Sequence, residues 1–132
     1  MVVIALDFTK AFDTVRHDTL FKKIAKLAIP DHIYNWMVVY FSQRSHCTKF
    51  KSDQSPAIGI NSSVIQGSAL GPAAYVISAS DLRPLYEQNT FSKYADDTLL
   101  IVPASNVDIR VSEIEHIRMW AERNNLKLNA RK

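Results

Sequence analysis

The sequence predicts an α+β fold, in which a small, mainly antiparallel sheet containing one hairpin packs on helices. Apolar runs of the β type occupy residues 2–6 and 98–102, and a half-apolar run at 91–94 precedes the second of them. Apolar residues along 107–121 instead recur at helical spacing. With 132 residues, 47% of them hydrophobic, the chain is expected to form a single globular domain.

The first predicted element is a strand over residues 2–6. Its unbroken apolar run is typical of a strand covered on both faces, and Asp7 ends it. Asp7 has two interpretations: it is a helix N-cap, a position that Asp favours, or it is a carboxylate placed at the end of a sheet strand. Residues 10–16 are expected to form an irregular crossover.

Two helices are predicted next, one from Asp18 or Thr19 to Pro30 and one that begins at Asp31. The first has an apolar face made of Leu20, Ile24 and Leu27, and an opposite face made of Lys22, Lys23 and Lys26. The lysine face is either solvated or a contact for nucleic-acid phosphates. One side of the second helix carries Ile33, Trp36, Met37 and Tyr40. The aromatics among them, Trp36 and Tyr40, are interpreted as core rather than as base-stacking platforms.

The sequence pattern in the middle of the chain predicts a hairpin followed by a loop and a helix. Loose alternation over 45–51 and an extended run at 57–60 suggest the two hairpin strands. Gln66, Gly67 and Ser68 then lead into a helix over 70–80. A Gly before a helix lets the backbone approach a ligand, and free amides at the helix start favour a phosphate. The alternative is a plain loop-to-helix junction with Ser68 as the cap.

Two adjacent carboxylates, Asp96 and Asp97, lie at the tip of the hairpin predicted over 91–102. Adjacent side chains face one site only if the backbone turns between them, which Asp tolerates. Two neighbouring anions favour a divalent cation when a further carboxylate arrives from elsewhere, and Asp7 is the candidate. Asp7 and Asp96 converge if their strands are neighbours in one sheet. The alternative is a solvated Asp-Asp turn.

The last predicted helix, over 107–121, is interpreted as structural. Its apolar stripe is followed by a turn at Asn124 and Asn125 and by a short edge strand over 126–129. The charged residues of this helix are expected to face water. They are Glu113, Glu115, Arg118 and Glu122.

Charge and composition narrow the classes of partner. The net charge is +3, and residues 1–66 hold eight Lys or Arg against five Asp or Glu, which suits a polyanion and is also ordinary for a soluble protein. Cys47 is the single cysteine, so the chain cannot build an internal disulfide or a cysteine-based zinc site. Four scattered histidines make a histidine metal site improbable. No apolar run approaches transmembrane length, so no membrane partner is expected.

Four segments, in this order and spacing, resemble the reverse transcriptase palm of non-LTR (LINE-type) retrotransposons. They are 7–13 (DFTKAFD), 66–72 (QGSALGP), 94–97 (YADD) and 120–132, and the resemblance covers essentially the whole chain. It implies a polymerase palm with a catalytic hairpin and part of the fingers over residues 1–132. The N-terminal fingers and the C-terminal thumb of the family are then expected to be missing, together with an endonuclease in the full-length parent.

The resemblance implies an RNA-directed DNA polymerase that performs two-metal, template-directed nucleotidyl transfer. Its partners would be an RNA template, a DNA primer and deoxynucleoside triphosphates. Asp7 and Asp96 would bridge two Mg²⁺ ions, with Mn²⁺ as a substitute, and Asp97 would lie close by. The backbone carbonyl of Phe8 would complete the coordination. Lys132 would donate a proton or charge to the leaving pyrophosphate.

The resemblance also assigns a nucleotide pocket. Phe12 would place its ring beneath the sugar, although the pattern alone makes it an ordinary core residue. Gln66 and Gly67 would line the pocket for the incoming nucleotide and template base. The family usually carries Gly-Val-Pro just before that Gln, whereas this chain has Ser63, Val64 and Ile65, which constrains the loop less.

The sequence leaves two alternative functions open. One is a non-catalytic relic of a retroelement that binds nucleic acid, because the missing fingers would carry the basic residues that clamp the triphosphate. The other is a different palm-type nucleotidyl transferase or cyclase, which leaves residues 66–72 unexplained. The family's life cycle would place the protein in the nucleus or the cytoplasm.

Overall fold

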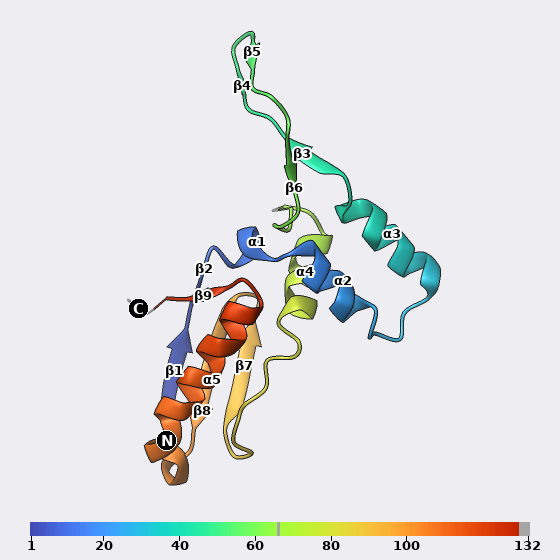
Figure 1. The fold of residues 1–132 in the computed structure, drawn as a ribbon. Helices are drawn as coiled ribbons and strands as arrows, with labels where there is room; N and C mark the ends of the chain where they lie inside the picture. The colour runs from blue at the N-terminus through green and yellow to red at the C-terminus, as the bar shows by residue number, and fades with distance from the viewer. Residues whose placement is uncertain (66, 130–132) are drawn as a thin grey trace.

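The computed structural model describes residues 1–65 and 67–129, and the α+β class is confirmed (Figure 1). None of the described helices is both long and apolar enough to cross a lipid bilayer. The elements in chain order are β1 Val2–Leu6, β2 Phe8–Thr9, α1 Ala11–Thr14, α2 His17–Ile24, α3 Asp31–Phe41, β3 Arg44–His46, β4 Lys49–Phe50, β5 Asp53–Gln54, β6 Ile58–Ile60, α4 Leu70–Ser78, β7 Thr90–Tyr94, β8 Asp97–Val102, the 3₁₀ helix η1 Ala104–Ile109, α5 Arg110–Arg123 and β9 Lys127–Leu128.

A three-stranded antiparallel sheet in the order β1-β8-β7 is the centre of the fold. Leu6 pairs with Thr98 and Tyr94 pairs with Asp97, so β7 and β8 form the predicted hairpin and β1 lies along its second strand. Along β8 the alternate residues Thr98, Leu100 and Val102 are buried, as period-two alternation requires. The predicted strand over 2–6 and the predicted hairpin over 91–102 are therefore confirmed.

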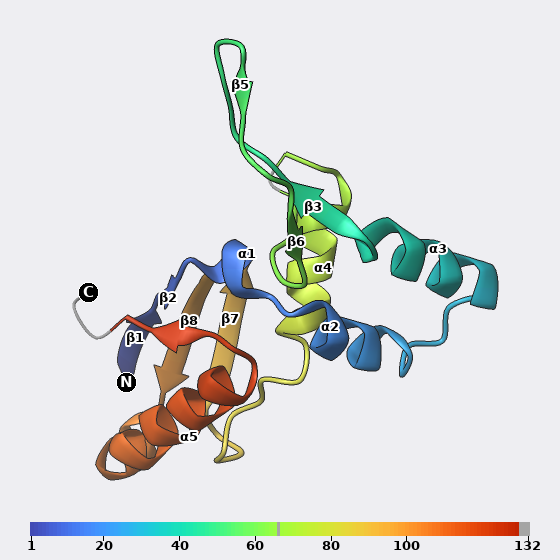
Figure 2. The same ribbon diagram turned by 45° about the horizontal axis from the view of Figure 1, so that its top comes forward.

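Only one face of β1 is covered within the described chain. Val2, Ile4 and Leu6 pack against the core that includes Ile117 of α5. Val3 on the opposite face is 52% exposed, so the prediction that this strand is covered on both faces is wrong. The physical reason is that α5 lies against one side of the sheet and leaves the other side open (Figures 1 and 2).

Helices α2 and α4 lie side by side next to the sheet (Figures 1 and 2). Leu20 and Ile24 of α2 are fully buried with Ala74 of α4. Helix α2 ends at Ile24, well before Pro30, and Leu27 is 41% exposed. The crossover over 10–16, predicted to be irregular, contains the single-turn helix α1.

Lys23 does not belong to a solvated lysine face. Its ammonium donates to Asp81 Oδ1 at 2.7 Å, to Asn124 Oδ1 at 2.6 Å and to the Ser78 carbonyl, and it lies over the Trp120 ring. Burial acts to raise the pKa of Asp81, but hydrogen bonds from Lys23 and Trp120 outweigh it and hold that pKa below its usual value. Lys23 thus joins α2 to the end of α4 and to α5.

Helix α3 is less buried than its composition predicts. Met37 and Phe41 are buried, whereas Trp36 is 55% exposed and stacks on the half-buried Tyr40. Ile33 is 41% exposed. The interpretation of Trp36 as a core residue is therefore wrong within residues 1–65 and 67–129.

The predicted middle hairpin is confirmed, with two ladders in place of one. Strand β3 pairs with β6 and β4 pairs with β5, and together they form an arm that stands away from the rest of the chain (Figures 1 and 2). His46 and Cys47 are exposed on this arm. The assignment of the arm to the fingers remains a prediction.

Glu113 of α5 is fully buried, contrary to the prediction that it faces water. Its carboxylate accepts hydrogen bonds from the backbone of Leu85 at 2.8 Å and of Tyr86 at 3.3 Å, and from Asn89 Nδ2 at 2.8 Å. The physical reason is that the segment between α4 and β7 packs on this side of α5 and turns its N–H groups toward the helix. Val111, predicted to lie on the apolar stripe, is 70% exposed.

Candidate active site

The sheet brings Asp7 to the tip of the β7–β8 hairpin. Asp7 directly follows β1, whose last residue, Leu6, pairs with Thr98 just after the tip. The tip itself turns at Ala95, which has a left-handed φ of 52°. Asp96 occupies the turn and Asp97 is the first residue of β8. The backbone turn that the two adjacent carboxylates required is therefore present.

Asp7 and Asp96 line one cavity of about 490 Å³. Asp97 is exposed and is not among the lining residues. The described part of the chain contains no group of three or more His, Cys, Asp or Glu side chains arranged to hold one metal ion. The structure thus places two of the three predicted acids together. The full lining is Asp7, Phe8, Thr9, Lys10, Ala11, Phe12, Asp13, Asp96 and Asn129.

The donor atoms of this cavity fit a hard divalent cation. Asp7, Asp13 and Asp96 line the cavity and carry carboxylates, and none of the described lining residues is a histidine or a cysteine. Mg²⁺ is commonly held by one or two carboxylates together with substrate phosphates, so two protein acids are a sufficient set. Phe8 also lines the cavity, and its buried ring packs edge-on against Trp120 with 5.9 Å between centroids.

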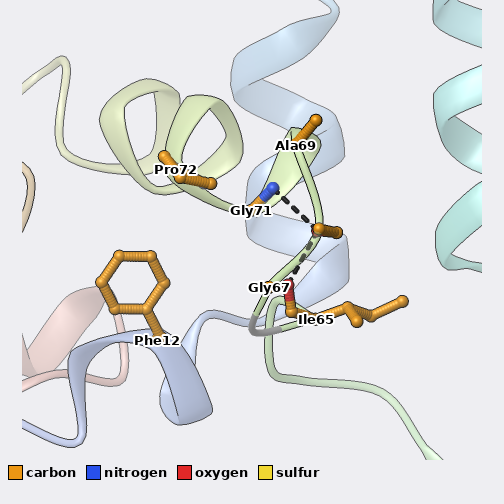
Figure 3. Close-up of a pocket in the computed structure, with 7 residues that line it drawn as sticks. Phe12, Ile65, Gly67, Ala69, Gly71 and Pro72 are labelled. Atoms are coloured by element: carbon orange, nitrogen blue, oxygen red, sulfur yellow. Dashed lines mark hydrogen bonds between the residues drawn. The ribbon is translucent and has the colours of Figure 1, made fainter.

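A second cavity, of about 630 Å³, lies between α1 and the start of α4. Phe12 lines both cavities and therefore stands between them. Figure 3 shows the Phe12 ring on one side, and Ile65, Gly67 and the start of α4 on the other. Gly67, a predicted site residue, lines this cavity with a φ of 79°. Gln66 and Lys132, which were also predicted, lie outside the described residues.

The N-cap of α4 is Ala69, and the side chain of the preceding Ser68 links the first turn of the helix to the loop before it. The Ser68 hydroxyl donates to the Ile65 carbonyl at 2.7 Å and accepts from the Gly71 N–H at 3.0 Å (Figure 3). A Cβ on residue 71 would lie 2.9 Å from the Ile65 carbonyl oxygen, so this close approach requires Gly71. The sequence pattern alone does not predict this role for Gly71.

The ring of Tyr75 packs against the ring of Phe12. The two rings stack with centroids 4.9 Å apart and an interplanar angle of 25°. Burial, and then the nearby charge of Asp96, raises the pKa of Tyr75 to about 12, so its hydroxyl stays protonated at neutral pH. Phe12 is consequently both a packed residue and a wall of the two cavities.

Lys93 fixes the hairpin to the end of α4. Its ammonium donates to the carbonyls of Ala79 at 2.9 Å and Leu82 at 2.8 Å. Burial lowers the pKa of Lys93. This contact sets the position of the strand that leads to Asp96.

A protein-family model described as "Reverse transcriptase (RNA-dependent DNA polymerase)" matches residues 1–132. The chain belongs to the reverse transcriptase family. It is 30% identical over 138 aligned positions to the RNA-directed DNA polymerase from mobile element jockey of Drosophila melanogaster. It is 28% identical to the probable RNA-directed DNA polymerase from transposon BS of the same organism. Each alignment covers 96% of this chain and 15% of the relative.

The family membership confirms the resemblance drawn from the four segments. The matched region, residues 1–132, contains all four segments. The chain spans about 15% of the length of these two relatives, so it corresponds to a small part of each.

Two residues of this reverse transcriptase chain were missed by sequence reasoning. Tyr75 and Asn129 touch Phe12 and Asp7 respectively, through a ring stack and a hydrogen bond. Tyr75 falls within a helical apolar run and Asn129 at the end of a predicted edge strand. Neither pattern carries a signal for a contact across so much of the chain.

Residues 63–65 are Ser-Val-Ile, where the family usually has Gly-Val-Pro, and the backbone at residue 63 shows the effect of this difference. Ser63 has a φ of 86°, in the left-handed region that favours glycine. The neighbouring N–H groups are nevertheless fixed, since Ser63 donates to the Val15 carbonyl and Val64 to the Phe12 carbonyl, each at 2.8 Å. The loop therefore keeps its attachment to the Phe12 segment while Ser63 carries the backbone strain.

Replacing Ser63 by Gly is expected to stabilise the fold by about 0.5 kcal/mol. Relief of the left-handed conformation is worth roughly 1 kcal/mol, and the extra freedom of glycine in the unfolded chain removes about half of it. Chemical denaturation measures the change. Ser62, the preceding residue, does not have a positive φ, so Ser62→Gly is the matched control and should destabilise the fold. A loss at residue 63 as large as that at residue 62 would contradict the strain argument.

Proposed function

We propose that this chain is the palm, with part of the fingers, of an RNA-directed DNA polymerase of a non-LTR retroelement. The reaction would be template-directed nucleotidyl transfer with two divalent ions. One observation carries the proposal: Asp7 and Asp96, which lie far apart in the sequence, line a cavity that shares the Phe12 wall with a second, larger cavity. This arrangement sets two carboxylates next to a space large enough for a nucleotide.

In the proposal, Asp7 and Asp96 hold two Mg²⁺ ions, with the carbonyl of Phe8 and the nearby Asp97 as further oxygen donors. When bound, the metal ions supply charge stabilisation and lower the pKa of the attacking hydroxyl. The protein's own task is to keep the acids in place. Mn²⁺ should substitute, because it accepts the same oxygen ligands.

The second cavity is assigned to the incoming nucleotide. Phe12 would lie beneath the sugar, where an aromatic ring cannot hydrogen-bond a 2′-hydroxyl and leaves little room for one. The Tyr75 stack fixes the Phe12 ring, which supports discrimination by shape. Gly67, with its left-handed backbone, would let the main chain approach the nucleotide closely. Gln66 beside it and Lys132 keep the roles that the family resemblance implies.

Membership of the reverse transcriptase family implies an RNA template and a DNA primer as partners. Among the described residues, Lys22 of α2 and Lys26, two residues beyond the end of α2, are exposed and available to phosphates. The remaining fingers, a thumb and an endonuclease are proposed for a full-length parent, following the family.

Primer extension tests the proposed function. The assay uses the 132-residue chain and any longer reading frame that contains it, with an RNA template, an annealed DNA primer, deoxynucleotides and Mg²⁺. Extension that depends on the template and on deoxynucleotides, with ribonucleotides used poorly, is the expected result. Salt-sensitive duplex binding without extension by either protein would favour the non-catalytic relic instead. Nucleotide turnover without a template would favour a template-independent transferase.

A further inference from the structure

Asn129 is hydrogen-bonded to Asp7 through both its side chain and its backbone. Its Nδ2 donates to Asp7 Oδ2 at 2.8 Å, and its N–H donates to the Asp7 carbonyl at 2.8 Å. The two residues meet because β9 pairs with β2 in antiparallel register, with Phe8 opposite Leu128 (Figures 1 and 2). Asn129 also lines the cavity that holds Asp7 and Asp96.

We propose that Asn129 is a positioning residue that fixes the rotation of the Asp7 carboxylate for cation binding. The inference rests on the proposed function, in which Asp7 is a metal ligand. An ionised carboxylate only accepts hydrogen bonds, so the atom that Asn129 presents to Oδ2 must be its NH₂ group. A neutral donor restrains the carboxylate without cancelling the charge that attracts a cation. A lysine at this place would instead compete with the cation.

The side-chain contact is separable from the contacts that hold β9 in place. The backbone bond from Asn129 to Asp7 and the β2–β9 ladder persist with any side chain other than proline at residue 129. Leu126, which precedes β9, is buried and its N–H donates to the Ala121 carbonyl at 2.8 Å. Removing the amide of Asn129 should therefore leave the strand docked and remove one restraint on the Asp7 carboxylate.

The variant Asn129→Leu tests this role with a readout other than catalysis. Mn²⁺ binding to the purified chain is measured by electron paramagnetic resonance, and Mg²⁺ binding by competition. Groups that orient a metal ligand typically change metal affinity by about 10- to 100-fold, so we expect at least a tenfold loss. Lys127→Leu, at an exposed position of the same strand, is the matched control and should bind Mn²⁺ as the wild type does.

Further measurements distinguish a positioning role of Asn129 from a purely structural role, and both from the absence of a metal site at Asp7. Asn129→Ser, whose hydroxyl is too short to reach Asp7 Oδ2, should give a similar loss and replaces the Leu variant if that fails to fold. A lower melting temperature with Mn²⁺ affinity within twofold of wild type would overturn the proposal and leave Asn129 a structural residue. Asp7→Asn, measured in parallel, separates the proposed metal site from the proposed role of Asn129. Unchanged Mn²⁺ affinity in Asp7→Asn refutes the metal site itself. If Asp7→Asn loses Mn²⁺ binding and the Asn129 variants keep it, only the role of Asn129 is refuted.

Discussion

Replacing Asp96 by Asn is expected to reduce Mg²⁺-dependent primer extension by at least about 1,000-fold, or about 4 kcal/mol in the activation barrier. The substitution keeps the shape of the side chain and removes its charge. Asp96 occupies the hairpin turn, and Asn tolerates turn conformations as well as Asp does, so the fold should be unchanged. The loss therefore measures the contribution of the carboxylate that shares a cavity with Asp7.

The control for this prediction is Asp18→Asn. Asp18 is an exposed carboxylate that is paired with Arg16 at 3.2 Å and does not line the Asp7 cavity. Its replacement should leave primer extension at the wild-type rate. Extension by the Asp96→Asn variant within tenfold of wild type, at an unchanged melting temperature, would show that Asp96 is not a metal ligand.

The sequence predicts those parts of the fold that local pattern determines. The apolar run 2–6 and the run 98–102 both became strands of one sheet, and the turn between Tyr94 and Asp97 followed from the two adjacent acids. The proximity of Asp7 to Asp96 followed from a topological argument, because a strand that ends beside a hairpin tip must place its next residue there. Period and register were sufficient for these predictions.

The remaining errors concern contacts that no local pattern encodes. Glu113 and Lys23 have the spacing of solvent-facing residues, but each is satisfied by groups from distant segments. Trp36 has the composition of a core residue, yet no described element covers it fully. The Asn129 contact with Asp7 likewise joins the two ends of the chain. Tertiary hydrogen bonds and partial coverage depend on three-dimensional packing, which periodicity cannot report.

Replacing Glu113 by Ala is expected to lower the free energy of unfolding by about 3 kcal/mol or more, which lowers the melting temperature by about 10 °C. The carboxylate is fully buried and accepts three hydrogen bonds from residues 85–89. Its removal leaves the N–H groups of Leu85 and Tyr86 and the amide of Asn89 without that acceptor. Each buried donor that loses its partner costs about 1–3 kcal/mol, although such costs do not add fully.

Two comparisons make the Glu113 prediction specific. Glu113→Gln keeps the volume but turns an NH₂ group toward donors, so it should lose about 2 kcal/mol. Glu115→Gln is the matched control. Glu115 lies two residues away on the same helix, is exposed, and forms an ion pair with Arg118. That change should not shift the melting temperature measurably. A double-mutant cycle between Glu113→Ala and Asn89→Ala should give a coupling above about 1 kcal/mol. Coupling near zero would mean that Glu113 stabilises the fold by packing alone and not by holding the 85–89 segment.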